Sequence, residues 1–320
     1  MSKKVATREA YGEALVELGR VDNRIVVLDA DLSTSTRTIL FAREFPERFF
    51  NFGIAEANMM CVAAGLASCG KIVFASTFAV FASGRAYNQF RTSIAYPRLN
   101  VKVVATHSGI SVGEDGVTHQ CVEDVTMMRA LPHTTVIIPA DGIETKEAVK
   151  ASIEWPGPVY MRLGRPAIPL VYEEGYKFDG RALKFEVGTA MKLKEGKDLT
   201  IIATGMMVTE ALTAAASLAK EGISASVMNV HTIKPLDESA IVKAAKQTGA
   251  VVTAEEHSIL GGLGGAVAEV LVENAQVPMI RVGIRDAFGE SGTTSELLVK
   301  YGLTASDILA ASKRALKMKR

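Results

Sequence analysis

Short apolar runs alternate with amphipathic stretches along the first half of the chain. In segment 8–18 the apolar residues recur at helical spacing, so that Tyr11, Leu15 and Leu18 share one face, and segment 145–155 is also amphipathic. The runs rich in β-branched residues lie at 25–29, 71–76, 101–106, 134–140 and 159–164. Continuous apolar strands separated by helices indicate strands buried on both faces, and hence a largely parallel sheet.

This alternation stops over 165–185, which contains two prolines, clusters of charge and no clear period. Such a segment is typical of an inter-domain linker. The alternation then restarts, with predicted strands at 199–205, 224–230, 250–256 and 279–284 and predicted helices at 208–222, 237–249 and 264–274. We therefore expect an α/β protein of two successive three-layer domains, each with a mostly parallel sheet, over 1–175 and 176–320.

The composition is that of a soluble globular protein, with 48% hydrophobic and 22% charged residues among 320. The formal net charge is +1, which gives no electrostatic reason to expect binding to nucleic acid or to an anionic membrane. The opening segment MSKKVATREAYGEAL has no apolar core of signal-peptide length, and no window approaches 18 uncharged apolar residues. We expect a cytoplasmic protein.

The three cysteines, Cys61, Cys69 and Cys121, form no CxxC pair. This spacing indicates neither a structural zinc site nor a disulfide framework. Apolar neighbours, as in MMCVAAGLA around Cys61, predict that the cysteines are small buried hydrophobic residues.

Candidate chemistry is densest in THSGISVGEDGVTHQ, residues 106–120, which contains two histidines, two acids and three glycines. The segment follows a predicted buried strand, and open α/β sheets bind ligands beyond the carboxyl ends of their strands. Glycines let the backbone approach a ligand closely, and the polar side chains supply hydrogen bonds and charge. Taken alone, the same residues are also compatible with a turn-rich surface loop.

Four segments together resemble transketolases. HSGISVGEDGVTHQ is similar to the GEDGPTHQ signature of that family, and NFGIAEANM at 51–59, STFAVF at 76–81 and DADLSTS at 29–35 match further family segments in the same order. VVTAEEH, GGLGG and RDAFGESG resemble the family's C-terminal domain. The resemblance covers the whole chain but only the C-terminal part of a full-length transketolase.

The resemblance implies a site for the pyrimidine ring of thiamine diphosphate. Glu56 would be the catalytic carboxyl that donates a hydrogen bond to the ring, and Phe78 and Phe81 would form the stacking face, with Phe81 as the direct partner. Asp31 would face the positively charged thiazolium ring. Glu56 has to be protonated or share its proton near neutral pH, and the apolar residues after it are expected to provide a pocket that favours the neutral carboxyl. In better-known members a third aromatic stands where this chain has Gly84.

The resemblance also assigns substrate contacts. His119 would act on the reacting end of the sugar, and Asp115 would contact an acceptor hydroxyl. The phosphate would be held by Arg8, Ser35, His107 and Arg165, since a phosphate needs fixed cations and hydrogen-bond donors. Taken singly, Arg8 could also be a solvated residue in the first turn of a helix, Ser35 a helix cap and Arg165 a charge in the linker.

Two features are expected to carry no chemistry. GGLGG at 261–265 opens a predicted helix but lacks the context of a dinucleotide or phosphate-binding loop. His133, His231 and His257 are interpreted as structural or surface histidines.

One family segment is missing. Thiamine enzymes bind the diphosphate through a divalent metal held in a GDG segment, and GDG does not occur in this sequence. The resemblance therefore implies that an N-terminal partner subunit binds the diphosphate and Mg²⁺ or Ca²⁺. It also implies an α2β2 heterotetramer in which this chain self-dimerises.

The resulting hypothesis is the C-terminal subunit of a split transketolase, which transfers a two-carbon ketol unit from a ketose phosphate to an aldose phosphate in the pentose phosphate pathway. The alternatives are half of a 1-deoxy-D-xylulose-5-phosphate synthase, the β-chain of a 2-oxoacid dehydrogenase, and a non-catalytic interaction subunit. His107 directly before SGISVGEDG favours transketolase over the enzymes that start from pyruvate. The presence of Glu56, Asp115 and His119 argues against a silent subunit.

Overall fold

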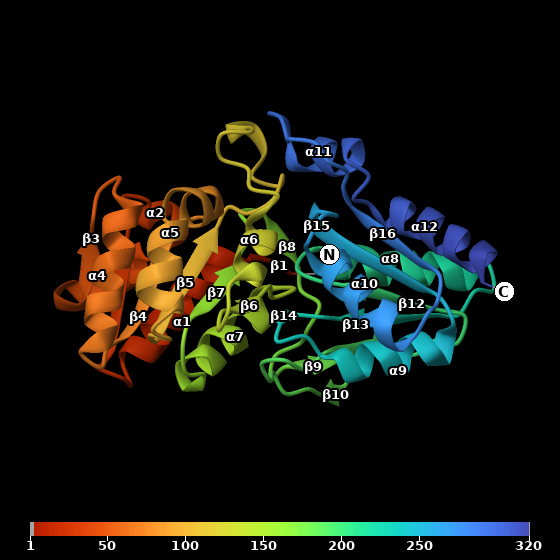
Figure 1. The fold of residues 1–320 in the computed structure, drawn as a ribbon, viewed down its shortest axis with the longest axis horizontal. Helices are drawn as coiled ribbons and strands as arrows, with labels where there is room; N and C mark the ends of the chain where they lie inside the picture. Colours follow the sequence, from red (N-terminus) through yellow and green to blue (C-terminus); the bar gives the residue numbers. More distant parts are fainter. Residues whose placement is uncertain (1–2, 320) are drawn as a thin grey trace.

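The computed structural model describes residues 3–319, which form two α/β units placed side by side (Figure 1). The first unit contains a seven-stranded sheet whose pairings are parallel except at one edge. Its strands, in spatial order, are β14 (Thr232–Lys234), β6 (Thr135–Ile137), β7 (Val159–Arg162), β5 (Val101–Thr106), β4 (Ile72–Phe78), β2 (Ile25–Asp29) and β3 (Phe49–Asn51).

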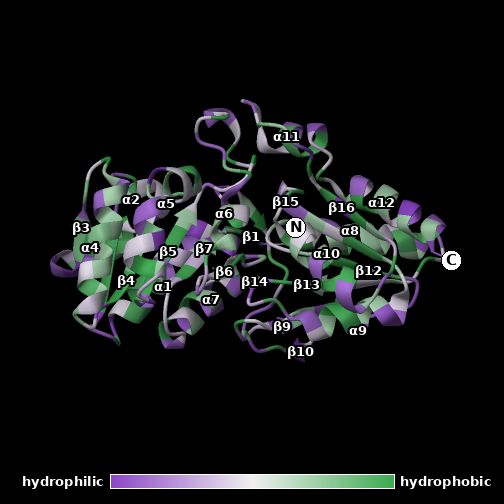
Figure 2. Ribbon diagram, viewed as in Figure 1, coloured by the Kyte–Doolittle hydropathy of each residue, from purple (hydrophilic) through white to green (hydrophobic). Residues whose placement is uncertain are grey.

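Helices cover both faces of this sheet. Phe74 belongs to the core that contains Tyr11 and Leu15, whereas its neighbour Val73 belongs to the core that contains Met60. This alternation is why the strands read as continuous apolar runs, and Figure 2 shows the strands largely in hydrophobic colours. The helices of this part are α1 (Thr7–Gly19), α2 (Ser33–Thr36), α3 (Ile39–Glu44), α4 (Glu56–Ser68), α5 (Tyr87–Gln89), α6 (Asp124–Ala130) and α7 (Gly142–Glu154).

The second unit has a five-stranded sheet in which only the edge strand β11 is antiparallel. Its strands, in spatial order, are β11 (Met191–Lys194), β13 (Ala225–Asn229), β12 (Leu199–Ala203), β15 (Val251–Ser258) and β16 (Met279–Ile284). Its helices are α8 (Met207–Lys220), α9 (Glu238–Thr248), α10 (Leu263–Asn274), α11 (Thr294–Lys300) and α12 (Ala305–Met318). The expected α/β class with two mostly parallel sheets is confirmed.

Local sequence signals explain where elements begin and end. Asp237 precedes α9, and its side chain accepts a hydrogen bond from the backbone N–H of Ala240. The same helix ends at Gly249, whose φ of 69° is the left-handed conformation that a glycine adopts without strain. The cap and the terminating glycine are why the expected helix 237–249 and the observed one agree.

The two halves of the chain are less separate than the sequence suggested. Strand β14 comes from the second half but pairs with β6 of the first sheet, with Thr232 opposite Ile137. The expected linker also contains ordered structure: β8 (Ala167–Pro169) pairs with β1 (Lys4–Ala6), and β9 (Lys177–Phe178) pairs with β10 (Arg181–Ala182). Strands this short have no detectable period, so the sequence pattern did not reveal them.

The expectation for the cysteines was wrong at two positions. Cys121 is buried, but Cys61 and Cys69 are exposed. Cys61 lies on the outer side of α4, where apolar neighbours in the sequence face the core while the cysteine itself does not. No helix among residues 3–319 is long and apolar enough to cross a membrane.

A buried polar cluster joins the linker segment to both units. The carboxylate of Glu144, at the start of α7, accepts hydrogen bonds from the hydroxyls of Tyr172 and Tyr176 and from the side-chain amide of Asn229 on β13. Burial raises the pKa of Glu144, while these donors act in the opposite direction. The linker is thus fixed to the body of the protein by hydrogen bonds to a buried acid.

Tyr176→Phe tests this cluster. The change removes the hydroxyl that donates to Glu144 at 2.7 Å but keeps the ring. We expect the free energy of unfolding in urea to fall by about 1.5–3 kcal/mol, the range for a lost hydrogen bond to a charged group. Tyr96→Phe is the matched control, because Tyr96 is 84% exposed and should have little effect. Equal stability of the two variants would contradict the assignment.

Candidate active site

The candidate site lies at the carboxyl ends of three adjacent parallel strands. Strand β4 lies between β2 and β5, and Phe78 at its end pairs with Thr106. Asp31 follows β2 and His107 follows β5. Loops that follow neighbouring parallel strands converge at one edge of the sheet, which is where open α/β folds bind ligands.

Four aromatic rings gather at this edge. The ring of Phe78 stacks on that of His107 with a centroid distance of 3.8 Å. The ring of Phe81 lies nearly parallel to the Phe78 ring, with a centroid distance of 5.9 Å. His119 meets the edge of Phe81 at 5.6 Å. Phe78 is buried and Phe81 is half-buried, so Phe81 offers more accessible ring surface to a ligand. The structure thus brings together four residues that the sequence analysis had selected separately.

His107 is a neutral histidine. Burial lowers its pKa to about 3, and the charges of Arg8, Arg165 and His119 act in the same direction. Its Nδ1 lies 2.9 Å from the hydroxyl of Thr106. At neutral pH His107 therefore offers hydrogen bonds rather than positive charge.

The cations of the site are Arg8, at the start of α1, and Arg165, shortly after β7. Arg8 donates from Nη1 to the backbone carbonyl of Ser35 at 2.9 Å, while its buried Nε has no partner within the described residues. Arg165 donates to the carbonyl of Val112 and lies 3.8 Å from the carboxylate of Asp115. Ser35 contacts Arg8 through its backbone, and it lies inside α2 rather than at its cap.

Glu56 opens α4 and is 4% exposed, but its surroundings are not purely apolar as expected. Arg85 donates from Nη1 to Oε1 of Glu56 at 2.9 Å. The same guanidinium lies over the ring of Phe81, 4.1 Å from its centroid. Arg85 thus connects the carboxyl and the aromatic surface that the resemblance assigns to the pyrimidine, and the sequence analysis did not select it.

Arg85 lies four residues after Phe81 in the turn that follows β4, a spacing at which side chains on one helix face meet. Residues Phe81–Arg85 form a π-helical turn, a conformation that occurs often at functional sites. Gly84 provides no wall, since a Cβ added there would meet no atom within 4 Å. Arg85 therefore covers Phe81 in this structure, and Gly84, the position of the family aromatic, lies beside open space.

Asp31 stands at an exposed turn with a positive φ of 63°. Its backbone N–H donates to the side chain of Asn51 at 3.0 Å, and the amide of Asn51 donates back to Oδ1 of Asp31 at 3.3 Å. Beneath it, burial raises the pKa of Asp29 to about 6, against hydrogen bonds from Thr36 and from the N–H of Leu32. Asn51, which comes from the short strand β3, is a second neighbour that sequence reasoning missed.

The features expected to be structural have internal partners. Glu255 accepts hydrogen bonds from the N–H groups of Leu263 and Gly264, so the N-terminus of α10 after GGLGG is already occupied by a carboxylate. His231 is buried and stacks on Phe185 at 4.1 Å. His257 is also buried.

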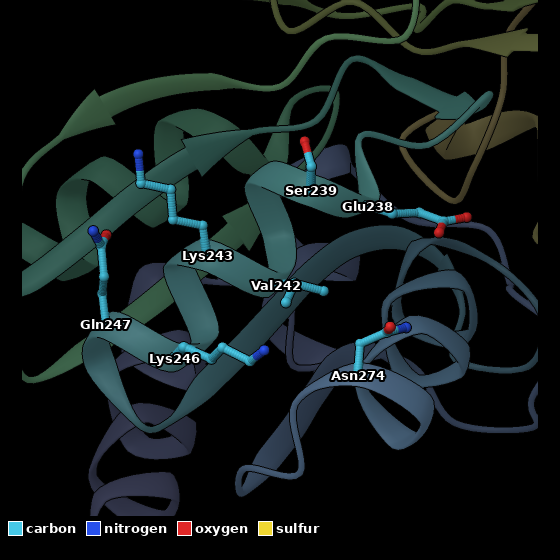
Figure 3. A pocket seen from close by; sticks show the side chains of 7 residues that line it. All are labelled: Glu238, Ser239, Val242, Lys243, Lys246, Gln247 and Asn274. Carbon is cyan, nitrogen blue, oxygen red and sulfur yellow. The ribbon is translucent and has the colours of Figure 1, made fainter.

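Two further observations bear on ligands. Residues 3–319 contain no cluster of three or more His, Cys, Asp or Glu side chains that could hold a metal ion. A surface groove between α9 and α10, drawn in Figure 3, is lined in part by Lys243, Lys246 and Asn274. It shares no residue with the site at the strand ends, and Lys243 and Lys246 are exposed, so we assign it no role in the chemistry.

Known proteins resemble both halves of the chain. The transketolase pyrimidine-binding domain family matches residues 3–170, and the transketolase C-terminal domain family matches 188–308. A protein of Methanocaldococcus jannaschii whose name describes a transketolase C-terminal section is 53% identical over 302 residues, covering 94% of this chain and 93% of that protein. A 6-deoxy-6-sulfo-D-fructose transketolase subunit of Clostridium sp. is 47% identical over 313 residues, covering 98% and 95%.

A solved structure is also similar. A chain described as a split-gene transketolase in an inactive β4 tetramer superposes with a TM-score of 0.91 at 55% identity, over 99% of this chain and all of that one.

Proposed function

This chain belongs to the transketolase family, and we propose that it is the C-terminal subunit of a split transketolase, transferring two-carbon ketol units between sugar phosphates together with an N-terminal partner. The observation that carries the proposal is the cluster of Glu56, Phe81, His107 and His119 at one edge of the first sheet. The resemblance assigns Glu56 and Phe81 to the cofactor, His119 to the reacting end of the sugar and His107 to its phosphate.

The residues present fit the pyrimidine half of thiamine diphosphate. Phe81 offers a ring face and Glu56 a carboxyl at its edge, and the flat guanidinium of Arg85 already makes both kinds of contact. Bound thiamine diphosphate would supply the carbon nucleophile that breaks and re-forms a carbon–carbon bond. In this proposal Phe78 and Phe81 orient the pyrimidine ring, and Glu56 holds a proton at the edge of that ring. Asp31 balances the positive charge of the thiazolium ring.

The substrate side of the site fits a sugar with an anionic end. Arg8 and Arg165 supply fixed charge, and neutral His107 supplies a hydrogen bond. His119 would contact the reacting carbons, and Asp115 would accept a hydrogen bond from an acceptor hydroxyl once it separates from Arg165. Because phosphate and sulfonate are both tetrahedral oxyanions, this charge pattern alone does not select between them.

The proposed assembly is an α2β2 heterotetramer, with the diphosphate and Mg²⁺ or Ca²⁺ held by the N-terminal subunit. The absence of a GDG segment from this sequence supports the division of labour. We also propose that the enzyme acts in the cytoplasm and in the pentose phosphate pathway.

A coupled assay of the reconstituted complex tests the function. Xylulose 5-phosphate plus ribose 5-phosphate should give turnover, whereas pyruvate plus an aldose phosphate should not. A third arm replaces the donor with 6-deoxy-6-sulfo-D-fructose, the sugar in the name of the Clostridium relative. Turnover with pyruvate alone would move the chain to the synthase or dehydrogenase alternatives, and activity only with the sulfo sugar would overturn the phosphate assignment.

Arg8→Ala and Arg165→Ala separate phosphate binding from chemistry. Contacts present in both the ground state and the transition state raise KM when they are lost and leave kcat unchanged. Each lost charge-assisted contact should cost about 1.5–3 kcal/mol with xylulose 5-phosphate. Arg20→Ala is the control, because Arg20 forms an exposed ion pair with Glu44 at 2.6 Å. An equal loss with the non-phosphorylated donor hydroxypyruvate would show that these arginines do not bind phosphate.

A further inference from the structure

The loop that carries His107, Asp115 and His119 is held by residues of the second unit. Figure 1 shows this loop beside α11, although the two are far apart in sequence. Thr294 donates to the carbonyl of Ser111 at 3.0 Å, and Gln120 donates to the carbonyl of Glu290 at 2.9 Å. The C-terminal domain thus contacts the loop at several points.

The central contact comes from Glu256, at the carboxyl end of β15. The backbone N–H of Ser111 donates to Oε1 of Glu256 at 2.7 Å, and Glu256 is 5% exposed. The carbonyl of Glu256 accepts a hydrogen bond from Arg162, whose guanidinium also pairs with the buried Asp124 at 2.9 Å. Glu256 is therefore anchored to the first sheet through its backbone and holds the loop through its side chain.

Gly109 is shaped to receive this carboxylate. A Cβ at position 109 would lie 2.2 Å from Oε1 of Glu256, far inside van der Waals contact. The φ of Gly109 is 73°, which side chains other than glycine rarely adopt. The carboxylate of Glu256 occupies the space that a side chain at position 109 would need. This position is two residues from His107 and two residues from Ser111.

We propose that Glu256 is a positioning residue for the reaction: it fixes the centre of the sugar-facing loop and thereby sets His107 against Phe78 at one end and Asp115 at the other. This inference rests on the proposed function. The role needs no contact between Glu256 and the substrate, because the carboxylate acts through the backbone of Ser111. Through Glu256 the C-terminal domain would contribute to the reaction at the first domain. The helix N-terminus after GGLGG does not, because it is occupied by the carboxylate of Glu255.

The kinetic test compares Glu256→Ala with Glu256→Gln in the reconstituted complex. The alanine variant loses the acceptor of the Ser111 N–H, and kcat/KM for xylulose 5-phosphate should fall by about 10- to 100-fold. The glutamine variant keeps an oxygen of the same reach and should stay within about threefold. The Kd of thiamine diphosphate should be unchanged in both, since Glu56 and Phe81 are not touched. A glutamine variant as impaired as alanine, or a weakened Kd in either variant, would overturn the positioning role.

The contact with Gly109 gives an independent test. Gly109→Ala should be severely impaired in the wild-type background, because the added methyl group and the carboxylate cannot share the space. In the Glu256→Ala background the same change should cost at least about fivefold less, since the obstructing carboxylate is gone. Losses that simply multiply would show that the two residues do not act on each other.

Hydrogen exchange of the full chain separates this inference from the proposed function. Amides of segment 107–116 should exchange at least about tenfold faster in Glu256→Ala than in wild type or Glu256→Gln. This readout needs no activity. Unchanged exchange would overturn the positioning role of Glu256 even if the complex is an active transketolase. Faster exchange in a chain whose complex has no transketolase activity would support that role and refute the proposed function.

Discussion

Replacing Glu56 with glutamine should leave the fold intact and lower the turnover of the reconstituted enzyme by about 100-fold or more. The side chain is 4% exposed and stands at the start of α4, beside the Phe81 ring that would stack on the pyrimidine. Glutamine keeps the size and retains an oxygen for Arg85, but it cannot give up a proton to the ring. The loss should therefore appear in kcat, with circular dichroism and the urea midpoint unchanged.

A matched control is Glu44→Gln, because Glu44 makes only an exposed pair with Arg20 and should leave turnover unchanged. Activity of Glu56→Gln within a few-fold of wild type would end the assignment of Glu56 as the catalytic carboxyl.

Arg85 adds a physical requirement to this role. Its guanidinium already donates a hydrogen bond to Oε1 of Glu56 at 2.9 Å, whereas in the proposed role the carboxyl bonds to the pyrimidine instead. Arg85 is about half exposed, so it has room to move toward solvent. Binding of the pyrimidine would then replace the guanidinium of Arg85 as the flat partner of Glu56 and Phe81.

The sheet strands were predictable because burial on both faces produces unbroken apolar runs. The observed β2 and β5 have the expected bounds, and α1 extends one residue beyond its expected segment at each end. Strands such as β3 and β14 were not predicted, because three residues are too few to show a period and their pairing depends on distant partners. The linker was predicted from its prolines, but its hydrogen bonds to Glu144 required the folded chain.

In the candidate site, too, some residues could be predicted from the sequence and others depended on contacts made only in the folded chain. Phe78 and His107 were each selected from sequence, because both stand at or just after the end of a predicted buried strand, but that these strands are adjacent came from the structure. Arg85 was not selected, because it lies outside the segments that resemble the family, although its i, i+4 spacing from Phe81 is one at which side chains on a helix meet. Glu256 was not selected either, since it reaches the loop from another domain, 145 residues away in sequence.

The purified chain alone should bind thiamine diphosphate weakly or not at all and should show no transketolase activity. Most of the cofactor's charge is in its diphosphate, and residues 3–319 offer no cluster of metal-ligating side chains to neutralise it. Phe81 and Glu56 could contact only the pyrimidine, and those contacts must also offset the entropy lost when the ligand is immobilised.

Mixing the chain with a partner of about 250–300 residues that carries a GDG segment should restore cofactor binding and activity together, in the presence of Mg²⁺ or Ca²⁺. Calorimetry on the isolated chain and on the mixture gives both measurements with the same cofactor solution. Within the mixture, Glu56→Gln should bind the cofactor but turn over slowly, which separates assembly of the site from its chemistry. Tight, metal-dependent binding by the chain alone, or turnover without the partner, would mean that the second half of the site is not supplied by another polypeptide.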